Sequence, residues 1–203
     1  MDVASFYREI IDGVAQPPDA RHERYVDVHT ALLDRYLDIL ETITPEQAAQ
    51  PVNQGEDRRT LAQLIGHIAE WDRFSIQAAS DILIGLNHPR TVTSVEGYVE
   101  PDGRVLNFAG VDDFNRYQAE KQADWSWERI RDLACDSAQM LHTLFTDEWL
   151  LHAERLERTL PWKKKLRNGI VLEPLTMGWT LWIIELEHLG AEHVTELHFY
   201  DES

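Results

Sequence analysis

Residues 60–86 read TLAQLIGHIAEWDRFSIQAASDILIGL, and this stretch decides the fold. Its apolar residues recur at steps of three and four, which is typical of one buried face of a long helix. That face is formed by Leu61, Leu64, Ile68, Trp71, Ile82 and Leu86. Thr60 is a suitable N-cap for the helix. At about 100° per residue, His67 lies at the edge of the apolar face, so its ring nitrogens need a partner.

The same period extends outward on both sides of this segment. It predicts helices over residues 21–43, 111–145 and 176–200. A short leader helix over 1–12 precedes them, and the helix over 111–145 is expected to bend near Asp124. Two long loops cover residues 87–110, with room for a small hairpin, and 156–173. The sequence therefore predicts an all-α fold, an antiparallel four-helix bundle with a long crossover loop, in a single domain over 1–203.

Charge and composition exclude several classes of protein. The 203 residues carry 36 Asp and Glu against 19 Lys and Arg, a net charge of −17. This excess of acid argues against nucleic acid and anionic membranes as partners. The longest almost wholly apolar run, Leu175–Ile184, is about half of what a membrane span needs. The first residues, MDVASFYREI, lack the apolar core of a signal peptide, so we expect a cytoplasmic protein. Cys135 is the sole cysteine, which excludes a Cys-based zinc cluster.

The last predicted helix carries a pattern suited to metal binding. Glu185, His188 and Glu192 form a stripe about 60° wide on its flank, with the spacing Glu-x-x-His-x-x-x-Glu. Such a stripe can present two ligands to one ion. With His67 from a facing helix, the set offers two nitrogens and one or two carboxylate oxygens. Three ligands with an open position are typical of catalytic zinc or of non-haem iron.

Structural interpretations of the same residues stay open. The glutamates could form a solvated face of an acidic protein, and His67 could be a core histidine bonded to a carbonyl. His193 falls in the core direction with Trp182, Leu186 and Leu189, so we expect a buried structural histidine there. The cluster Lys163-Lys164-Lys165 lies in the second loop, either as a solvated segment or as an attractor for an anionic substrate.

Three blocks of sequence together resemble a known superfamily. They are Thr60–Trp71, Phe114–Glu120 with Trp127–Ile130, and Trp179–Gly190. In order and spacing they are similar to helices of the DinB/YfiT-like metalloenzyme superfamily, notably its maleylpyruvate-isomerase-like branches. The resemblance implies an antiparallel four-helix bundle with a long crossover.

The resemblance also implies a divalent metal, zinc, nickel or iron. Members bind it through one histidine of the second helix and two ligands four residues apart on the last helix. His67 matches the first ligand and His188 matches the last. Ile184, four residues before His188, cannot bind metal, so the resemblance would require Glu185 or Glu192 to complete the set.

Two hypotheses of function follow from the resemblance. The first is a divalent-metal-dependent enzyme, a thiol-dependent transferase or isomerase or a small-molecule hydrolase. Its partners would be a small-molecule substrate or a low-molecular-weight thiol. A bound metal would lower the pKa of that thiol or of a water. The alternative is a non-catalytic bundle with a degenerate metal site, acting as a binding protein or as a homodimeric interaction protein.

Overall fold

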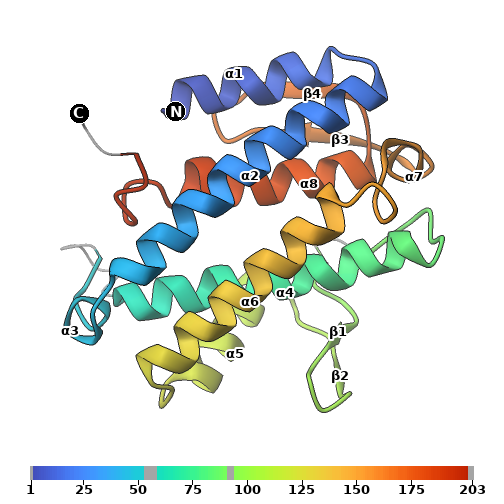
Figure 1. Ribbon diagram of the computed structural model, residues 1–203. Coiled ribbons are helices and arrows are strands. Elements are labelled where there is room, and N and C mark those ends of the chain that lie inside the picture. The colour runs from blue at the N-terminus through green and yellow to red at the C-terminus, as the bar shows by residue number, and fades with distance from the viewer. Residues whose placement is uncertain (1, 53–58, 91–93, 201–203) are drawn as a thin grey trace.

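The computed structural model describes residues 2–52, 59–90 and 94–200. Within these residues the bundle is built from α2 (Pro18–Thr42), α4 (Leu61–Leu83), α6 (Trp127–Thr146) and α8 (Met177–Glu187) (Figure 1). Helix α4 packs against both α6 and α8, and α2 covers the other side of these two helices. The predicted all-α bundle is confirmed. Among the described residues, no helix has the length and apolarity that crossing a membrane requires.

Helices α4 and α6 run in the same direction, which requires a long crossover between them (Figure 1). The crossover carries the antiparallel pair β1 (Tyr98–Val99) and β2 (Val105–Leu106), then α5 (Val111–Gln122). Residues 91–93 of the predicted loop lie outside the described residues.

The long helix predicted over 111–145 is two helices. Ser126 accepts a hydrogen bond from the backbone N–H of Arg129 and so caps a new helix, α6. The buried face of α5 turns instead to α4, where Phe114 packs between Trp71 and Tyr98. This contact forms a second, smaller apolar cluster beside the main core.

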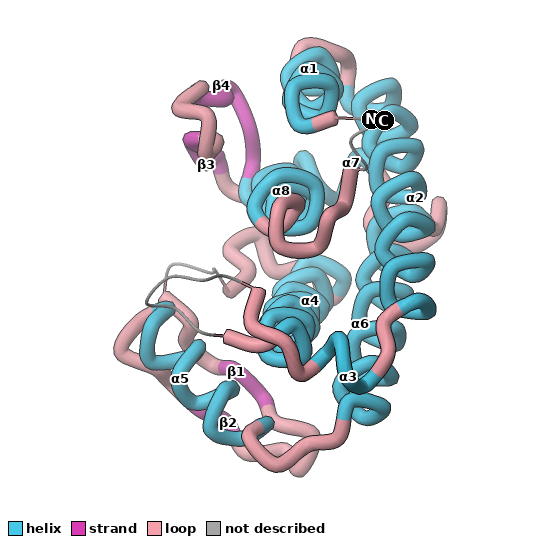
Figure 2. The backbone as a smooth tube through the Cα atoms, turned by 90° about the vertical axis from the view of Figure 1, so that its left-hand side faces the viewer, coloured by secondary structure: helices cyan, strands magenta, loops and turns pink. Residues whose placement is uncertain are grey.

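Short elements complete the fold. Among the described residues they are α1 (Val3–Val14), α3 (Pro45–Ala48), α7 (Ala153–Glu157), β3 (Pro161–Lys165) and β4 (Val171–Thr176). The second predicted loop is therefore largely an antiparallel hairpin of β3 and β4, in which Pro161 lies opposite Thr176 and Lys165 opposite Val171. Figure 2 shows this hairpin beside α8, and it shows α5 beside α4.

The end of the last helix differs from the sequence-based prediction. Helix α8 ends at Glu187 and is followed by a π-helical turn over His188–Glu192. The predicted α-helix extended to residue 200. In this turn Gly190 packs on α1. A Cβ atom at this position would lie 2.7 Å from Cε2 of Phe6, so glycine is required for the close approach.

A carboxylic acid is enclosed in the core between α4 and α6. Asp72 is buried, and its Oδ2 accepts a hydrogen bond of 3.1 Å from Ser137 Oγ. Burial raises the pKa of Asp72 to about 7, although the serine hydrogen bond opposes the shift. The protonated form is therefore the stable one in the folded state at mildly acidic pH.

This burial predicts an unusual pH dependence of stability. In the folded state Asp72 keeps its proton up to about pH 7, whereas in the unfolded chain it loses the proton near pH 4. The free energy of unfolding therefore falls as pH rises from about 4 to 7. Asp72→Asn keeps the acceptor and cannot ionise. Relative to wild type, its unfolding free energy should rise by about 2–4 kcal/mol across that interval. Urea unfolding at several pH values measures the difference, and a difference independent of pH would contradict the assignment.

Candidate metal centre

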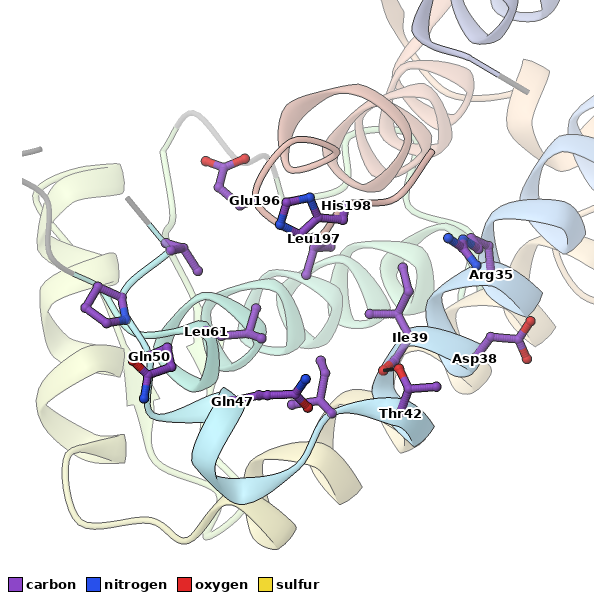
Figure 3. Close-up of a pocket in the computed structure, with 13 residues that line it drawn as sticks. Arg35, Asp38, Ile39, Thr42, Gln47, Gln50, Leu61, Glu196, Leu197 and His198 are labelled. Atoms are coloured by element: carbon purple, nitrogen blue, oxygen red, sulfur yellow. Dashed lines mark hydrogen bonds between the residues drawn. The ribbon is translucent and has the colours of Figure 1, made fainter. Parts of the chain in front are cut away.

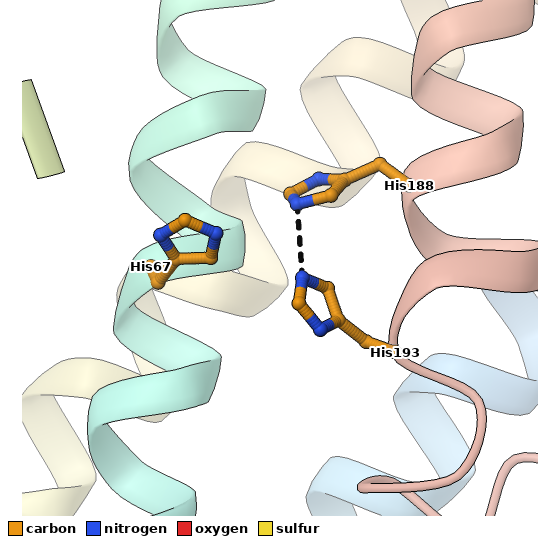
Figure 4. Close-up of side chains that lie close together, drawn as sticks. All are labelled: His67, His188 and His193. Atoms are coloured by element: carbon orange, nitrogen blue, oxygen red, sulfur yellow. Dashed lines mark hydrogen bonds between the residues drawn. The ribbon is translucent and has the colours of Figure 1, made fainter. Parts of the chain in front are cut away.

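Three histidines from two elements meet at one end of the α4–α8 contact. His67 lies on the second turn of α4, His188 begins the π-helical turn, and His193 directly follows it (Figure 4). One ring nitrogen from each lies within 4.8 Å of the others, and the Nε2 atoms of His188 and His193 are 3.2 Å apart. The predicted proximity of the second and last helices is confirmed, and it places His67 opposite His188.

The spacing of these nitrogens fits a metal ion. Two ligands at the usual zinc–nitrogen distance of about 2.0–2.1 Å, at a tetrahedral angle, are separated by about 3.3 Å. The distance between His188 and His193 Nε2 matches this separation. Three imidazoles also leave one position of a tetrahedral ion open, which is the arrangement of catalytic rather than structural sites.

The electrostatics of the cluster favour the form that binds metals. Burial lowers the pKa of His193 to about 3, and the neighbouring His67 adds to the shift. Burial also holds the pKa of His188 well below its ordinary value, with further contributions from His193 and His67. Both rings are therefore neutral near pH 7, as coordination requires.

One outward-facing nitrogen of the cluster has an acceptor nearby. His193 Nδ1 is buried and has no hydrogen-bond partner among the described residues. Glu196 Oε1, three residues further on, lies 4.0 Å from it. Metal-bound histidines usually donate their second N–H to a carboxylate, and a small side-chain movement would complete that bond here.

The π-helical turn explains why sequence analysis placed His193 elsewhere. At 100° per residue, a position five residues after His188 lies about 140° around an α-helix. In a π-helical turn the backbone bonds link residues five apart, so His193 returns to the face of His188. The prediction that His193 is buried and hydrogen-bonded is confirmed. The expectation of a purely structural histidine did not include its position beside His67 and His188.

The two glutamates predicted as alternative ligands lie beside the cluster but outside the group of converging nitrogens. Glu185 accepts a hydrogen bond from Ser75 of α4, and burial raises its pKa to about 8. It is therefore mostly protonated near neutral pH, whereas a coordinating carboxylate must be ionised. Glu192 pairs with Arg167 at the end of the β3–β4 hairpin. Among the described residues, the side chain that joins His67 and His188 in a group of converging ligand atoms is His193.

The cluster opens on a cavity of about 430 Å³. His67 and His188 form part of its wall, and Glu185 and Glu192 line it as well. The β3–β4 hairpin supplies the facing wall with Trp162, Lys164 and Arg167, and of these Lys164 forms an ion pair of 2.7 Å with the buried Glu187. This wall lies within the second predicted loop, which the structure folds as a hairpin.

A larger cavity of about 510 Å³ lies at another place, between the end of α2, α3 and the C-terminal segment (Figure 3). Its wall mixes aliphatic side chains such as Ile39 and Leu61 with polar ones such as Arg35 and Glu196. His198 lies at its rim (Figure 3). Within the described chain, His67 and His188 of the converging group line the 430 Å³ cavity, and that cavity is therefore the candidate site.

The π-helical turn yields a prediction about spacing. Deletion of Ala191 would place the two histidines four residues apart, where a regular α-helix also presents them to one ion. Zinc affinity, measured by competition with a chromophoric chelator, should stay within about tenfold of wild type. Deletion of Thr195, beyond His193, is the matched control. Complete loss of zinc binding on deletion of Ala191 alone would show that the wider turn is indispensable.

Comparison with known proteins identifies the family. The model of the DinB superfamily matches residues 29–190, which include the bundle helices, His67 and His188. No curated protein and no solved structure shows significant similarity to the chain. The matched segment covers most of the sequence and ends inside the π-helical turn. The chain therefore belongs to the DinB superfamily.

Proposed function

We propose that the chain is a metal-dependent enzyme that acts on a small molecule in the 430 Å³ cavity. A single divalent ion, zinc, nickel or iron, would be held by His67, His188 and His193. The observation that carries the proposal is the convergence of three imidazole nitrogens within 4.8 Å, two of them from histidines in the wall of that cavity. Imidazole is a suitable ligand for each of these metals.

A bound ion would act as a Lewis acid and lower the pKa of a coordinated thiol or water. The chain's own residues would bind and orient the substrate. Trp71 and Trp162 offer flat apolar surfaces on opposite walls of the cavity. The raised pKa of Glu185 keeps its carboxylic acid protonated near neutral pH. The Oε2 atom of this acid has no hydrogen-bond partner among the described residues. It could therefore donate that proton to a substrate group.

Two reaction classes agree with this arrangement. A coordinated thiolate would serve transfer or isomerisation with a low-molecular-weight thiol, and a coordinated hydroxide would serve hydrolysis of a small substrate. Membership of the DinB superfamily is compatible with both, because function depends on the site rather than on the fold. A chain that binds no metal would instead be a binding or interaction protein built on the same bundle.

Metal content tests the proposed ligand set. Protein purified without a polyhistidine tag should hold about one equivalent of zinc, nickel or iron by elemental analysis. His193→Ala should reduce occupancy at least tenfold, because the two remaining imidazoles chelate more weakly. Glu192→Gln should retain the metal. His29→Ala removes an equally buried histidine outside the cluster and is the matched control. Full occupancy in His193→Ala would refute the three-histidine site.

Activity is measured on the same preparations. The metal-loaded and metal-free proteins are compared in the reaction of small thiols with 1-chloro-2,4-dinitrobenzene and in the hydrolysis of p-nitrophenyl acetate. A rate that depends on the metal and is lost in His193→Ala supports the enzyme and selects the reaction class. A wild-type protein that takes up no metal and shows neither activity would support the binding protein instead.

A further inference from the structure

A second, smaller cavity adjoins the candidate metal centre. It measures about 190 Å³ and lies between α4 and α5. His67, Trp71 and Asn115 line both this cavity and the larger one, so the two are neighbours on either side of these side chains. Arg59 lines the small cavity, and its charge contributes to lowering the pKa of His193. The small cavity therefore extends beside the histidine cluster.

A buried glutamine in the wall of the small cavity is left without hydrogen bonds. Gln118 of α5 is only 3% exposed, yet neither its Oε1 nor its Nε2 has a partner among the described residues. The neighbouring amide side chains do have hydrogen-bond partners. Gln122 Nε2 donates to Glu70 Oε1, and Asn115 Oδ1 accepts from Trp71 Nε1. A buried donor and a buried acceptor that both lack partners destabilise the folded state, so this pair calls for an explanation.

The chemistry of Gln118 selects the ligand group. A carboxamide presents one acceptor and one donor side by side, and a primary amide, which has its carbonyl and one N–H on the same side, satisfies both at once. A carboxylate would leave Oε1 unpaired, an ammonium group would leave Nε2 unpaired, and a hydrocarbon would leave both. Trp71 and Phe114 provide aromatic surfaces in the same wall, against which a planar amide can pack.

From these observations we infer that the cavity between α4 and α5 is a subsite for an amide group of the ligand, bound by Gln118. The inference rests on the proposed function, since the same ligand would place its reacting atom on the ion beside His67. The ligand class is a small molecule that joins a metal-binding sulfur or oxygen to a primary amide.

Two thiols that differ in one group test the subsite. 3-Mercaptopropanamide carries a primary amide, and methyl 3-mercaptopropanoate carries an ester at the same distance from the thiol that lacks the N–H donor. Each is titrated into the cobalt(II)-loaded protein, where thiolate binding produces a charge-transfer absorption. Wild type should bind the amide roughly tenfold more tightly than the ester, as one additional buried hydrogen bond provides. In Gln118→Leu the two affinities should become equal, while the affinity for the ester stays within about threefold of wild type.

A metal-free measurement separates this inference from the proposed function. Saturation-transfer NMR compares acetamide with methyl acetate on the metal-free wild-type and Gln118→Leu proteins. Leucine removes an unsatisfied amide, so thermal unfolding should show a folded variant at least as stable as wild type. Equal affinities of wild type for the two thiols, with no amide-specific transfer, overturn the subsite alone. Amide-specific transfer without any cobalt–thiolate band supports the subsite and overturns thiol binding at the metal.

Discussion

The antiparallel contact between α4 and α8 is the constraint on which the candidate site depends. It brings the second turn of α4 against the C-terminal end of α8, so that His67 meets two histidines 121 and 126 positions later in the sequence. The contact is held by apolar packing along both helices and by the hydrogen bond from Ser75 to Glu185. Because interiors are closely packed, the ring positions are set by the helices themselves rather than by a mobile loop. Such rigidity is what a preorganised ligand set requires.

Much of this arrangement could be predicted from the sequence. The apolar period of residues 60–86 and of residues 21–43 is regular, so the bundle, the facing helices and the position of His67 followed from an α-helical repeat. The β3–β4 hairpin could not be found in this way. Strand β3 is mostly exposed and carries Lys163-Lys164-Lys165, so it lacks the alternation of apolar and polar residues that indicates a half-buried strand.

His193 was missed for a different reason. The position predicted for His193 assumed the rotation of 100° per residue that an α-helix has. That assumption fails at the π-helical turn, where backbone hydrogen bonds link residues five apart. One local signal is present in the sequence, namely Gly190, whose lack of a side chain allows Phe6 of α1 to approach the turn. A glycine inside an otherwise apolar helix permits several structures, so it does not by itself specify a π-helical turn.

Charge is distributed unevenly between the surface and the interior of this acidic protein. The surface carries most of a net charge of −17, whereas buried Asp72 and Glu185 have raised pKa values and the buried histidines have lowered ones. Burial thus drives acids and bases alike towards their neutral forms. A divalent ion would be the strongest charge near the cluster, and few fixed counter-charges would offset its effect on a bound ligand.

The π-helical turn also affects how relatives of this chain are recognised. A turn of this kind accommodates one extra residue without breaking the helix, so an alignment against relatives with four-residue spacing needs a gap inside a helix. When His188 is aligned with the first of the two last-helix ligands of such relatives, instead of with the last, an ungapped alignment pairs Glu192 with the second ligand and leaves His193 one column out of place. A chain with a complete set of nitrogen ligands would then be classified as having lost one. Surveys that infer inactive members from missing ligand columns should therefore allow a single-residue insertion between the two positions.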